Sequence, residues 1–183
     1  KTEQETKLTS AKGGKNYGGV FRINMIRGNP NGLDPVIINS KLADDIALQV
    51  YDRLISFDSS LGVIPEAAKS WEISPDGKEY TFHLRTDMTF HDNACFPKGK
   101  GRKMIAKDVE YSLTRACDPK ARTVHYWAFK DKVVGANAFY DARIAGKDVK
   151  NIEGIQAMND STLNIRLTRA YSPFLLLLAN SLG

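Results

Sequence analysis

Strict alternation of apolar and polar residues predicts a hairpin at WEISPDGKEYTFHLR, residues 71–85. Such alternation is typical of strands that have one face on a core and the other in water. Between the two runs, Ser74-Pro75-Asp76-Gly77 fits a type I turn, because Pro presets φ at the second position and Gly suits the fourth. The strands would turn Trp71, Ile73, Tyr80, Phe82 and Leu84 toward the core, and Glu72, Thr81 and His83 toward water.

Other stretches carry a strand pattern as well. Residues 153–170 predict a second hairpin with Asn159 and Asp160 near its turn. Residues 17–26 alternate well enough for a strand, and residues 56–65 predict a short strand and a turn. Residues 88–96 are a candidate extension of the sheet. In the second hairpin the side chains expected to face inward are Leu163, Ile165 and Leu167.

Apolar residues three or four positions apart predict helices over 41–55 and 106–116. Ser40 can cap the first helix, with Asp44 and Asp45 in its first turn. A loop followed by one or two helices is expected over 118–149, and Ser172-Pro173 would start a last helix. The apolar faces are Leu42, Ile46, Val50 and Leu54 in the first helix, and Val109 and Leu113 in the second, which has Asp108 in its first turn.

These separate hairpins and helices predict an α+β (mixed α/β) fold class. Residues 1–16 are polar and glycine-rich, so a flexible tether is expected there. The chain does not open with Met, and Lys1 is therefore expected to be a processed or engineered start. The longest apolar run, residues 174–179, is far shorter than the roughly 20 residues that a membrane span needs.

The composition is that of an ordinary soluble globular protein, with 42% hydrophobic and 26% charged residues. The net charge of +5 is mild, and nothing in it favours nucleic acid as a partner. The one basic cluster lacks the interleaved aromatic residues of a nucleic-acid site, so a solvated loop is expected, with an anion contact as the alternative. This cluster consists of Lys98, Lys100, Arg102 and Lys103.

No catalytic or metal-binding constellation stands out. A nucleophilic site needs a Ser or Cys served by a His, and the sequence neighbours His91 and Cys95 are not expected to converge. Metal-ligand spacings such as CxxC are missing, so no metal and no cofactor is predicted. Cys95 and Cys117 either form a disulfide, as in exported proteins, or remain two separate thiols. The protein is therefore not expected to be an enzyme.

An aromatic group, His125-Tyr126-Trp127, is expected to be exposed in a loop or at a helix start. Aromatic side chains on loops suit ligand contact. Packing into the core is the alternative for the same three residues.

A series of motifs resembles one known family, the bacterial extracellular solute-binding proteins of family 5, of the oligopeptide- and dipeptide-binding type. The resemblance covers about residues 17–180 and rests on the order of the motifs. They are LDP at 33–35, VYDRL at 50–54, IPEAAKSW at 64–71, SPDGKEYTFHLR at 74–85, MTFHDN at 88–93, AKDVEYSLTR at 106–115, DP at 118–119 and GIQAMNDSTLNIRLTRAYSPFLLLLA at 154–179.

The resemblance implies the amino-terminal part of a periplasmic-binding-protein type II fold with the accessory subdomain of peptide binders. Residues 17–40 would start ligand-binding lobe I, residues 41–168 would form the accessory subdomain, and residues 169–183 would return toward lobe I. Family members are about three times as long as this chain. The chain is thus expected to be a fragment that lacks the second lobe.

The family's function is then expected of the whole protein. It would be the substrate-binding component of an ABC importer that captures di- or oligopeptides and delivers them to a permease complex in the membrane. It would be a monomer in the periplasm or at the cell surface, with its signal peptide removed and an N-terminal lipid as anchor. The alternatives are a non-catalytic structural or interaction module, or a family member that binds a sugar, a metal chelate or another non-peptide solute.

The resemblance also implies ligand-binding residues. Asn39, Ser40 and Lys41 match the strand that pairs with the peptide backbone, and His125 and Tyr126 match the aromatic position that reaches the cleft. The family's usual Thr before the AKDV motif is Ile105 here, which removes a hydroxyl cap from the helix that follows.

Overall fold

The computed structural model describes residues 9–10, 16–17 and 32–179. In its amino-terminal part, β1 (Thr9–Ser10) and β2 (Asn16–Tyr17) form an antiparallel pair. The rest of the strand predicted over 17–26 lies outside the described residues. No helix within the described ranges is long and apolar enough to cross a bilayer.

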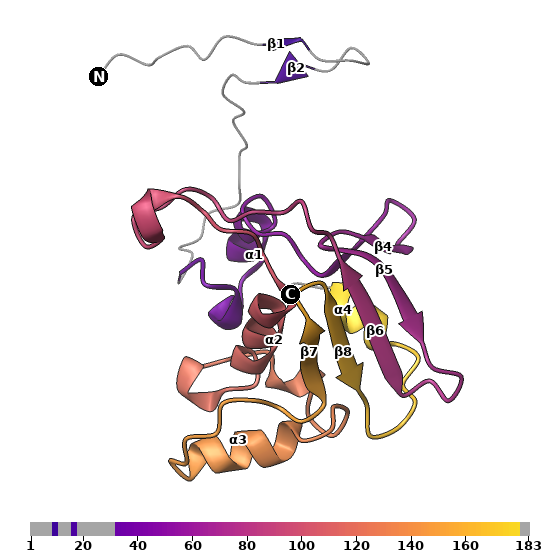
Figure 1. The fold of residues 1–183 in the computed structure, drawn as a ribbon. Helices are drawn as coiled ribbons and strands as arrows, with labels where there is room; N and C mark the ends of the chain where they lie inside the picture. The colour runs from indigo at the N-terminus through magenta and orange to yellow at the C-terminus, as the bar shows by residue number, and fades with distance from the viewer. Residues whose placement is uncertain (1–8, 11–15, 18–31, 180–183) are drawn as a thin grey trace.

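A four-stranded antiparallel sheet in the order β5-β6-β8-β7 organises the fold (Figure 1). Its halves are the two predicted hairpins: β5 (Ala68–Ile73) with β6 (Glu79–Leu84), and β7 (Ile155–Asn159) with β8 (Thr162–Arg166). Strands β6 and β8 pair in the middle, so segments far apart in the sequence share one core. The buried side chains include Tyr80, Phe82, Leu84, Leu163, Ile165 and Leu167, as the alternation predicts.

One residue of the predicted apolar face departs from the pattern. Ile73 is 46% exposed, although its pairing with Tyr80 places it on the core side of the sheet. It ends the edge strand β5, where fewer neighbours can cover it. Trp71 is half-buried, with its ring 6.5 Å from that of Phe82.

The predicted turn of the first hairpin is present. The Gly77 N–H donates to the Ser74 carbonyl at 2.8 Å, and the Glu79 N–H donates to the Ser74 hydroxyl at 2.9 Å. Gly77 has φ +68°, a left-handed conformation that glycine adopts without steric cost. The turn therefore follows directly from the SPDG sequence.

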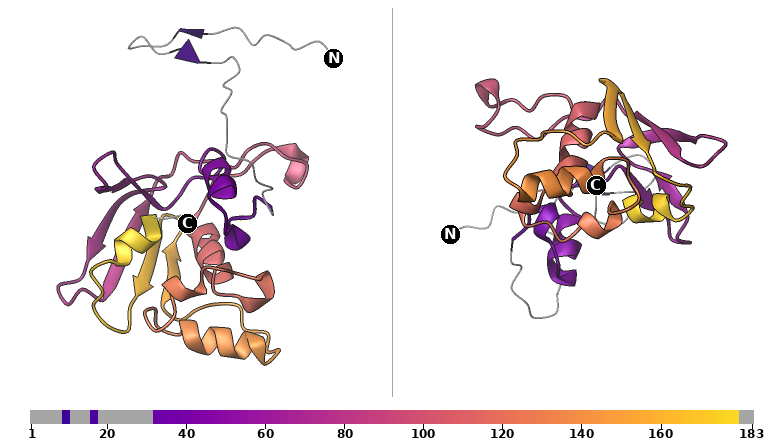
Figure 2. Two further views of the ribbon diagram at one scale, coloured as in Figure 1. Left: turned by 180° about the vertical axis from the view of Figure 1, so that it is seen from behind. Right: turned by 90° about the horizontal axis from the view of Figure 1, so that it is seen from below.

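Two helices cover the apolar face of the sheet. Figures 1 and 2 show α4 (Phe174–Ala179) lying across it and α2 (Ala106–Arg115) beside its β7 edge. The Phe174 ring lies 5.2 Å from the Tyr80 ring, and Leu113 of α2 is fully buried. As expected, Ile105 gives α2 no hydroxyl cap; its N–H donates instead to Asp108 at 2.9 Å.

The first predicted helix is shorter than expected. Helix α1 (Lys41–Ala47) begins as predicted, with the Ala43 N–H bonded to the Ser40 hydroxyl at 3.3 Å. It does not continue to residue 55, because the backbone of residues 53–54 pairs with residues 67–68. The chain then enters a small hairpin of β3 (Ile55–Phe57) and β4 (Val63–Pro65), where a strand and turn were predicted.

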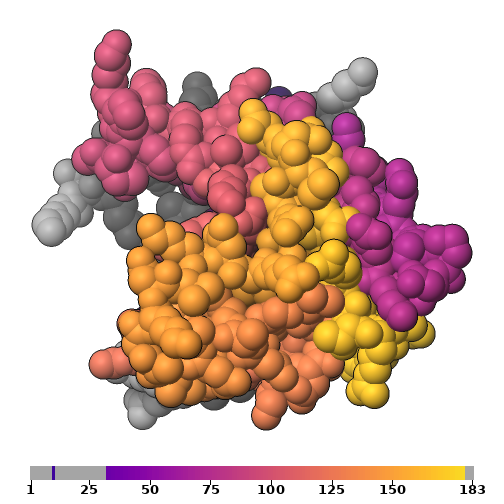
Figure 3. All heavy atoms as spheres, turned by 60° about the horizontal axis from the view of Figure 1, so that its bottom comes forward, coloured from indigo at the N-terminus to yellow at the C-terminus, as the bar shows by residue number. Residues whose placement is uncertain are grey.

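The predicted extension of the sheet over 88–96 is wrong. This segment belongs to a projecting loop, visible in Figures 1 and 3, that contains η2 (Pro97–Gly99). It makes only an isolated antiparallel bridge, from Thr89 to Lys103. Gly101 allows this loop to close, because a side chain there would collide with the Phe90 carbonyl.

Residues 118–149 form short turns and one helix, as predicted. The turns are η3 (Pro119–Ala121) and η4 (Tyr126–Ala128), and the helix is α3 (Ala136–Ile144). The Arg143 guanidinium binds Asp118 at 2.7 Å and joins α3 to the start of the segment. The remaining short helix, η1 (Pro35–Ile37), lies near η4, since the Val124 N–H donates to the Val36 carbonyl.

Candidate ligand-binding site

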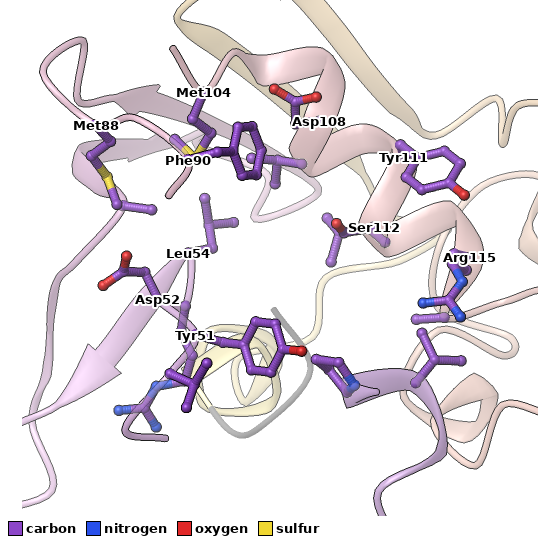
Figure 4. Close-up of a pocket in the computed structure, with 18 of the residues that line it drawn as sticks. Tyr51, Asp52, Leu54, Met88, Phe90, Met104, Asp108, Tyr111, Ser112 and Arg115 are labelled. Atoms are coloured by element: carbon purple, nitrogen blue, oxygen red, sulfur yellow. The ribbon is translucent and has the colours of Figure 1, made fainter. Parts of the chain in front are cut away.

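A cavity of about 810 Å³ opens between α2, the segment before α1, the segment before β3 and the loop after β6 (Figure 4). Its volume lies within the roughly 300–1,000 Å³ that is typical of small-molecule sites. In Figure 4, Asp52 and Met88 stand at one end, Tyr111 and Arg115 at the other, and Leu54 and Ser112 between them.

The lining of the cavity is mostly apolar and partly open to solvent. Exposed apolar patches of this kind are typical of ligand-binding grooves and of surfaces that contact other protein segments. Methionine and aromatic side chains suit this role, because they adapt to different apolar shapes. The exposed apolar residues on the lining are Leu33, Val50, Tyr51, Phe90 and Tyr111, and Met88 and Met104 also line the cavity.

An ion pair holds the first wall, residues 33–36, against α2. The Arg115 guanidinium forms two hydrogen bonds with the Asp34 carboxylate, one of them 2.8 Å long. The hydrogen bond from Arg115 lowers the pKa of Asp34, so this carboxylate stays charged. The same carboxylate accepts the Val36 N–H at 3.2 Å and thereby shapes the turn of η1.

His125 ties the same wall to the segment before η4. Its Nε2 donates to the Pro35 carbonyl at 2.9 Å, and its side chain is buried. Burial lowers the pKa of His125, although the bond to Pro35 and the charge of Asp44 act in the opposite direction. A neutral imidazole that donates to a carbonyl is thus the stable state here.

Helix α2 presents one face to the cavity. Asp108, Tyr111, Ser112 and Arg115 follow one another at helical spacing, and all four line the space. Arg102 binds Asp108 at 2.6 Å while lying 4.9 Å above the Phe90 ring. This arrangement anchors the projecting loop to the first turn of α2.

Arg53 fixes the position of a third wall of the cavity, residues 50–54, which faces α2 and the first wall. The backbone N–H and the guanidinium of Arg53 bind Glu66, and the guanidinium also donates to Ser56 and to the Ala179 carbonyl at 3.0 Å. These contacts join β3 to the end of α4. They hold the backbone that carries Tyr51 and Asp52 toward the cavity.

Of the five predicted ligand residues, His125 lines the cavity and the others do not. Asn39 is exposed, Ser40 caps α1 and Lys41 pairs with Asp45 at the surface. The structure thus keeps residues 39–41 together at the start of α1, apart from the lining.

Tyr126 packs inside the domain. Its ring stacks on Tyr140 at 3.9 Å, and its hydroxyl donates to Asn137 at 3.0 Å. Burial raises its pKa to about 12. Of the two predicted states of this aromatic group, packing into the core holds for His125, which is buried, and for Tyr126, which is half-buried against the core. Exposure holds for Trp127, which is 56% exposed.

The two cysteines are free thiols, which selects the second of the two predicted states. Cys117 is buried and Cys95 is exposed on the projecting loop. In the same loop Lys100 pairs with Asp92 at 2.6 Å, while Lys98 points into solvent. The described residues contain no group of three or more His, Cys, Asp or Glu side chains placed to hold a metal ion.

Most residues that line the cavity were not predicted from the sequence, although those on α2 could have been. The face of α2 follows from helical spacing once the helix is recognised. The packing of this face against residues 33–36 and 50–54 depends on contacts between segments far apart in the sequence, and no local sequence pattern predicts such contacts.

Comparison with known proteins gives consistent matches. The model of the bacterial extracellular solute-binding proteins, family 5 middle, matches residues 62–183. Di/tripeptide-binding protein 4 of Pseudomonas aeruginosa is 34% identical over 80% of this chain and 26% of its own length. Heme-binding protein A of Haemophilus influenzae is 34% identical over 80% of this chain and 25% of its own.

Solved structures share the fold. The crystal structure of a periplasmic oligopeptide-binding protein from Borrelia burgdorferi superposes with a TM-score of 0.71 at 29% identity. The match covers 84% of this chain and 28% of that one. The chain therefore has the α+β fold of one part of the periplasmic oligopeptide-binding proteins, and it spans about a quarter of the length of the relatives it matches.

Proposed function

Because the chain belongs to the bacterial extracellular solute-binding proteins of family 5, we propose that it serves an ABC importer as part of a peptide-capturing protein. The ligands are di- or oligopeptides, which the whole protein binds outside the cytoplasmic membrane and passes to a permease complex. The names of its relatives support this role, since the Pseudomonas protein is a di/tripeptide-binding protein.

The observation that carries the proposal is the apolar cavity beside the LDP segment. Its walls are held by fixed contacts, such as the pair of Asp34 and Arg115 and the bond from His125 to Pro35. A ligand would find this surface already arranged, which reduces the entropic cost of binding.

The division of the chain follows the same proposal. Residues 17–40 begin lobe I, residues 41–168 form the accessory subdomain, residues 169–183 return toward lobe I, and residues 1–16 are a tether. Two lobes that both contact a ligand are stabilised in the closed form by that ligand. Within this scheme residues 39–41, which lie outside the lining, offer their backbone to the part of the peptide that extends beyond the cavity. His125 lies on the lining itself, and Tyr126, the next residue, packs without reaching the cavity.

The mechanism is binding without catalysis, and it uses no cofactor or metal. His125, the buried imidazole, has a structural partner in the Pro35 carbonyl. We propose a monomer in the periplasm or at the cell surface, anchored to a membrane by an N-terminal lipid. No nucleic-acid partner is proposed, since Arg102 and Lys100 of the basic projecting loop already pair with Asp108 and Asp92.

The test is thermal unfolding of the full-length gene product with a mixture of di- to hexapeptides. Stabilisation should rise with the ratio of ligand concentration to Kd. Tyr111→Ala should weaken that shift, because Tyr111 lies on the lining and is 68% exposed. Trp127→Ala, a change of another exposed aromatic residue away from the lining, is the matched control and should keep the shift.

Two results would contradict the proposal. A shift with hemin but with no peptide would reject peptides as the ligand and leave the family's solute-binding role intact. A peptide shift that Tyr111→Ala leaves unchanged would separate peptide binding from this cavity.

A further inference from the structure

Every charged residue on the cavity lining except one forms an ion pair with an oppositely charged side chain. The charged lining residues are Asp34, Asp52, Arg53, Asp108 and Arg115. Asp34 pairs with Arg115, Arg53 with Glu66, and Asp108 with Arg102. Asp52 has no hydrogen bond or ion pair with any residue between 32 and 179.

The charge of Asp52 acts on Arg85, whose pKa it raises, but the Arg85 guanidinium already binds another carboxylate. This guanidinium binds both carboxylate oxygens of Asp87, at 3.0 and 2.8 Å. Asp87 raises the pKa of Arg85 more than Asp52 does, because Asp87 bonds to the guanidinium directly. The negative charge of Asp52 is thus available to a group that enters the cavity.

The two histidines on the lining do not offset this charge. His125 is buried and its Nε2–H is used by the Pro35 carbonyl. His91 is exposed on the projecting loop and makes no hydrogen bond or ion pair with Asp52. The end of the cavity that holds Asp52 and Met88 therefore carries one net negative charge beside apolar side chains (Figure 4).

The surrounding groups suit a long side chain that ends in a cation. Met88, Leu54 and Tyr51 stand close to Asp52 in Figure 4 and would cover the methylene groups of such a chain. The ring face of a tyrosine also attracts cations. An apolar solute with carboxylates would meet repulsion from Asp52 instead.

Resting on the proposed function, we infer that this end of the cavity selects peptides with a lysine-like side chain, whose alkyl stem lies on Met88 and Tyr51 and whose ammonium pairs with Asp52. The site is thus a specificity-determining subsite for a cationic, partly apolar group. Asp52 binds the ligand and no bond is made or broken.

The experiment measures affinities of the full-length gene product by titration calorimetry. The probes are Ala-Phe-Lys, Ala-Lys-Phe and Lys-Ala-Phe, each beside the peptide with norleucine in place of Lys. Norleucine keeps the alkyl stem and lacks the ammonium. In at least one pair the Lys peptide should bind about fivefold more tightly, as expected for a partly exposed ion pair.

Asp52→Asn should remove that difference and leave the affinity for the norleucine peptide unchanged. Asp160→Asn is the matched control, since Asp160 is exposed in the turn between β7 and β8 and its side chain has no partner within residues 32–179. It should keep the preference for Lys. Circular dichroism of both variants confirms that they are folded.

The outcomes separate the two proposals. Equal affinity for every Lys and norleucine pair, or a preference for Lys that survives Asp52→Asn, would overturn the inference and leave peptide capture standing. No binding by any of the six peptides would overturn the proposed function and this inference with it.

Discussion

At the scale of single residues, Asp34 and His125 decide where the segment before α1 lies. The Asp34 carboxylate accepts hydrogen bonds from the Arg115 guanidinium, and the His125 imidazole donates a hydrogen bond to the carbonyl of the neighbouring Pro35. Both contacts tie residues 33–36 to elements that come some eighty or ninety positions later, as their separations of 81 and 90 residues show. One wall of the cavity thus depends on two side chains.

The pH dependence of stability should reveal His125. Burial lowers its pKa, so the unfolded chain binds a proton more readily than the folded protein does. The free energy of unfolding is therefore highest above the ordinary imidazole pKa of about 6.5 and falls as the pH drops from about 7 to 5. His125→Gln should lose part of this slope in denaturant titrations and cost about 1 kcal/mol at pH 7.5.

His91→Gln is the control for that experiment, because His91 is exposed and has no partner within residues 32–179. It should keep the slope of the parent protein. An identical slope for His125→Gln and the parent protein would show that His125 does not resist protonation in the folded state.

Thiol labelling should distinguish the two cysteines. Burial raises the pKa of Cys117, which leaves its thiol protonated as well as inaccessible. Cys95 is exposed on the projecting loop. In the native protein a thiol reagent should modify Cys95 alone, and in denaturant it should modify both; native protein that yields a thiol only after reduction would instead indicate a disulfide.

At the scale of elements, α2 protects the open edge of β7. Glu110 is 4% exposed, and one of its oxygens accepts the Ala157 N–H at 2.8 Å. Lys107 binds the other oxygen from the same helix. The bond lies beside a register shift between Ala157 and Asn159, where the ladder of β7 and β8 is irregular.

Glu110→Ala should destabilise the protein by about 1–3 kcal/mol, because it leaves a partly buried N–H without an acceptor. Glu110→Gln keeps an acceptor and should cost less. Lys107→Ala, which removes only the exposed partner, should cost under about 1 kcal/mol. Chemical denaturation measures all three, and a Lys107→Ala loss as large as that of Glu110→Ala would assign the effect to the ion pair.

The elements also show how far the sequence could predict the fold. The two hairpins were predictable because alternation and turn chemistry are local, as in Tyr80 to Leu84 and Ser74 to Gly77. The sequence predicted too long a helix α1, because Val50 and Leu54 continue the helical spacing of apolar residues. In the structure, however, the backbone of Leu54 pairs with Ala68. Such a long-range pairing is not encoded in any local pattern.

The candidate site was less predictable than the fold. The resemblance to the family pointed to His125, which lines the cavity, and to residues 39–41, which lie apart from it. Tyr51, Asp52 and Tyr111 carried no distinguishing signal, because isolated aromatic and acidic residues are common on surfaces. Their convergence follows only from the packing of α2 against the segments before α1 and β3.

At the scale of the whole molecule, the chain combines a rigid sheet with an open apolar surface. The sheet and its covering helices supply a well-packed core around Phe82, Phe129 and Phe174. The cavity lies on the side where residues 33–36 and 50–54 meet α2, and it leaves Tyr51 and Tyr111 partly in water. Exposing such surface costs stability, which a bound ligand would recover.

Photo-cross-linking with a tripeptide tests the central claim, that this cavity binds the solute, most directly. The probe is Ala-Phe-Lys with benzoylphenylalanine in place of Phe, irradiated with the full-length gene product and mapped by mass spectrometry. The account predicts cross-links within residues 33–36, 50–54, 88–91 or 106–115, which unlabelled Ala-Phe-Lys suppresses. Suppressible cross-links confined to other segments, such as the polar face of the sheet around Thr81 and Asn164, would contradict it.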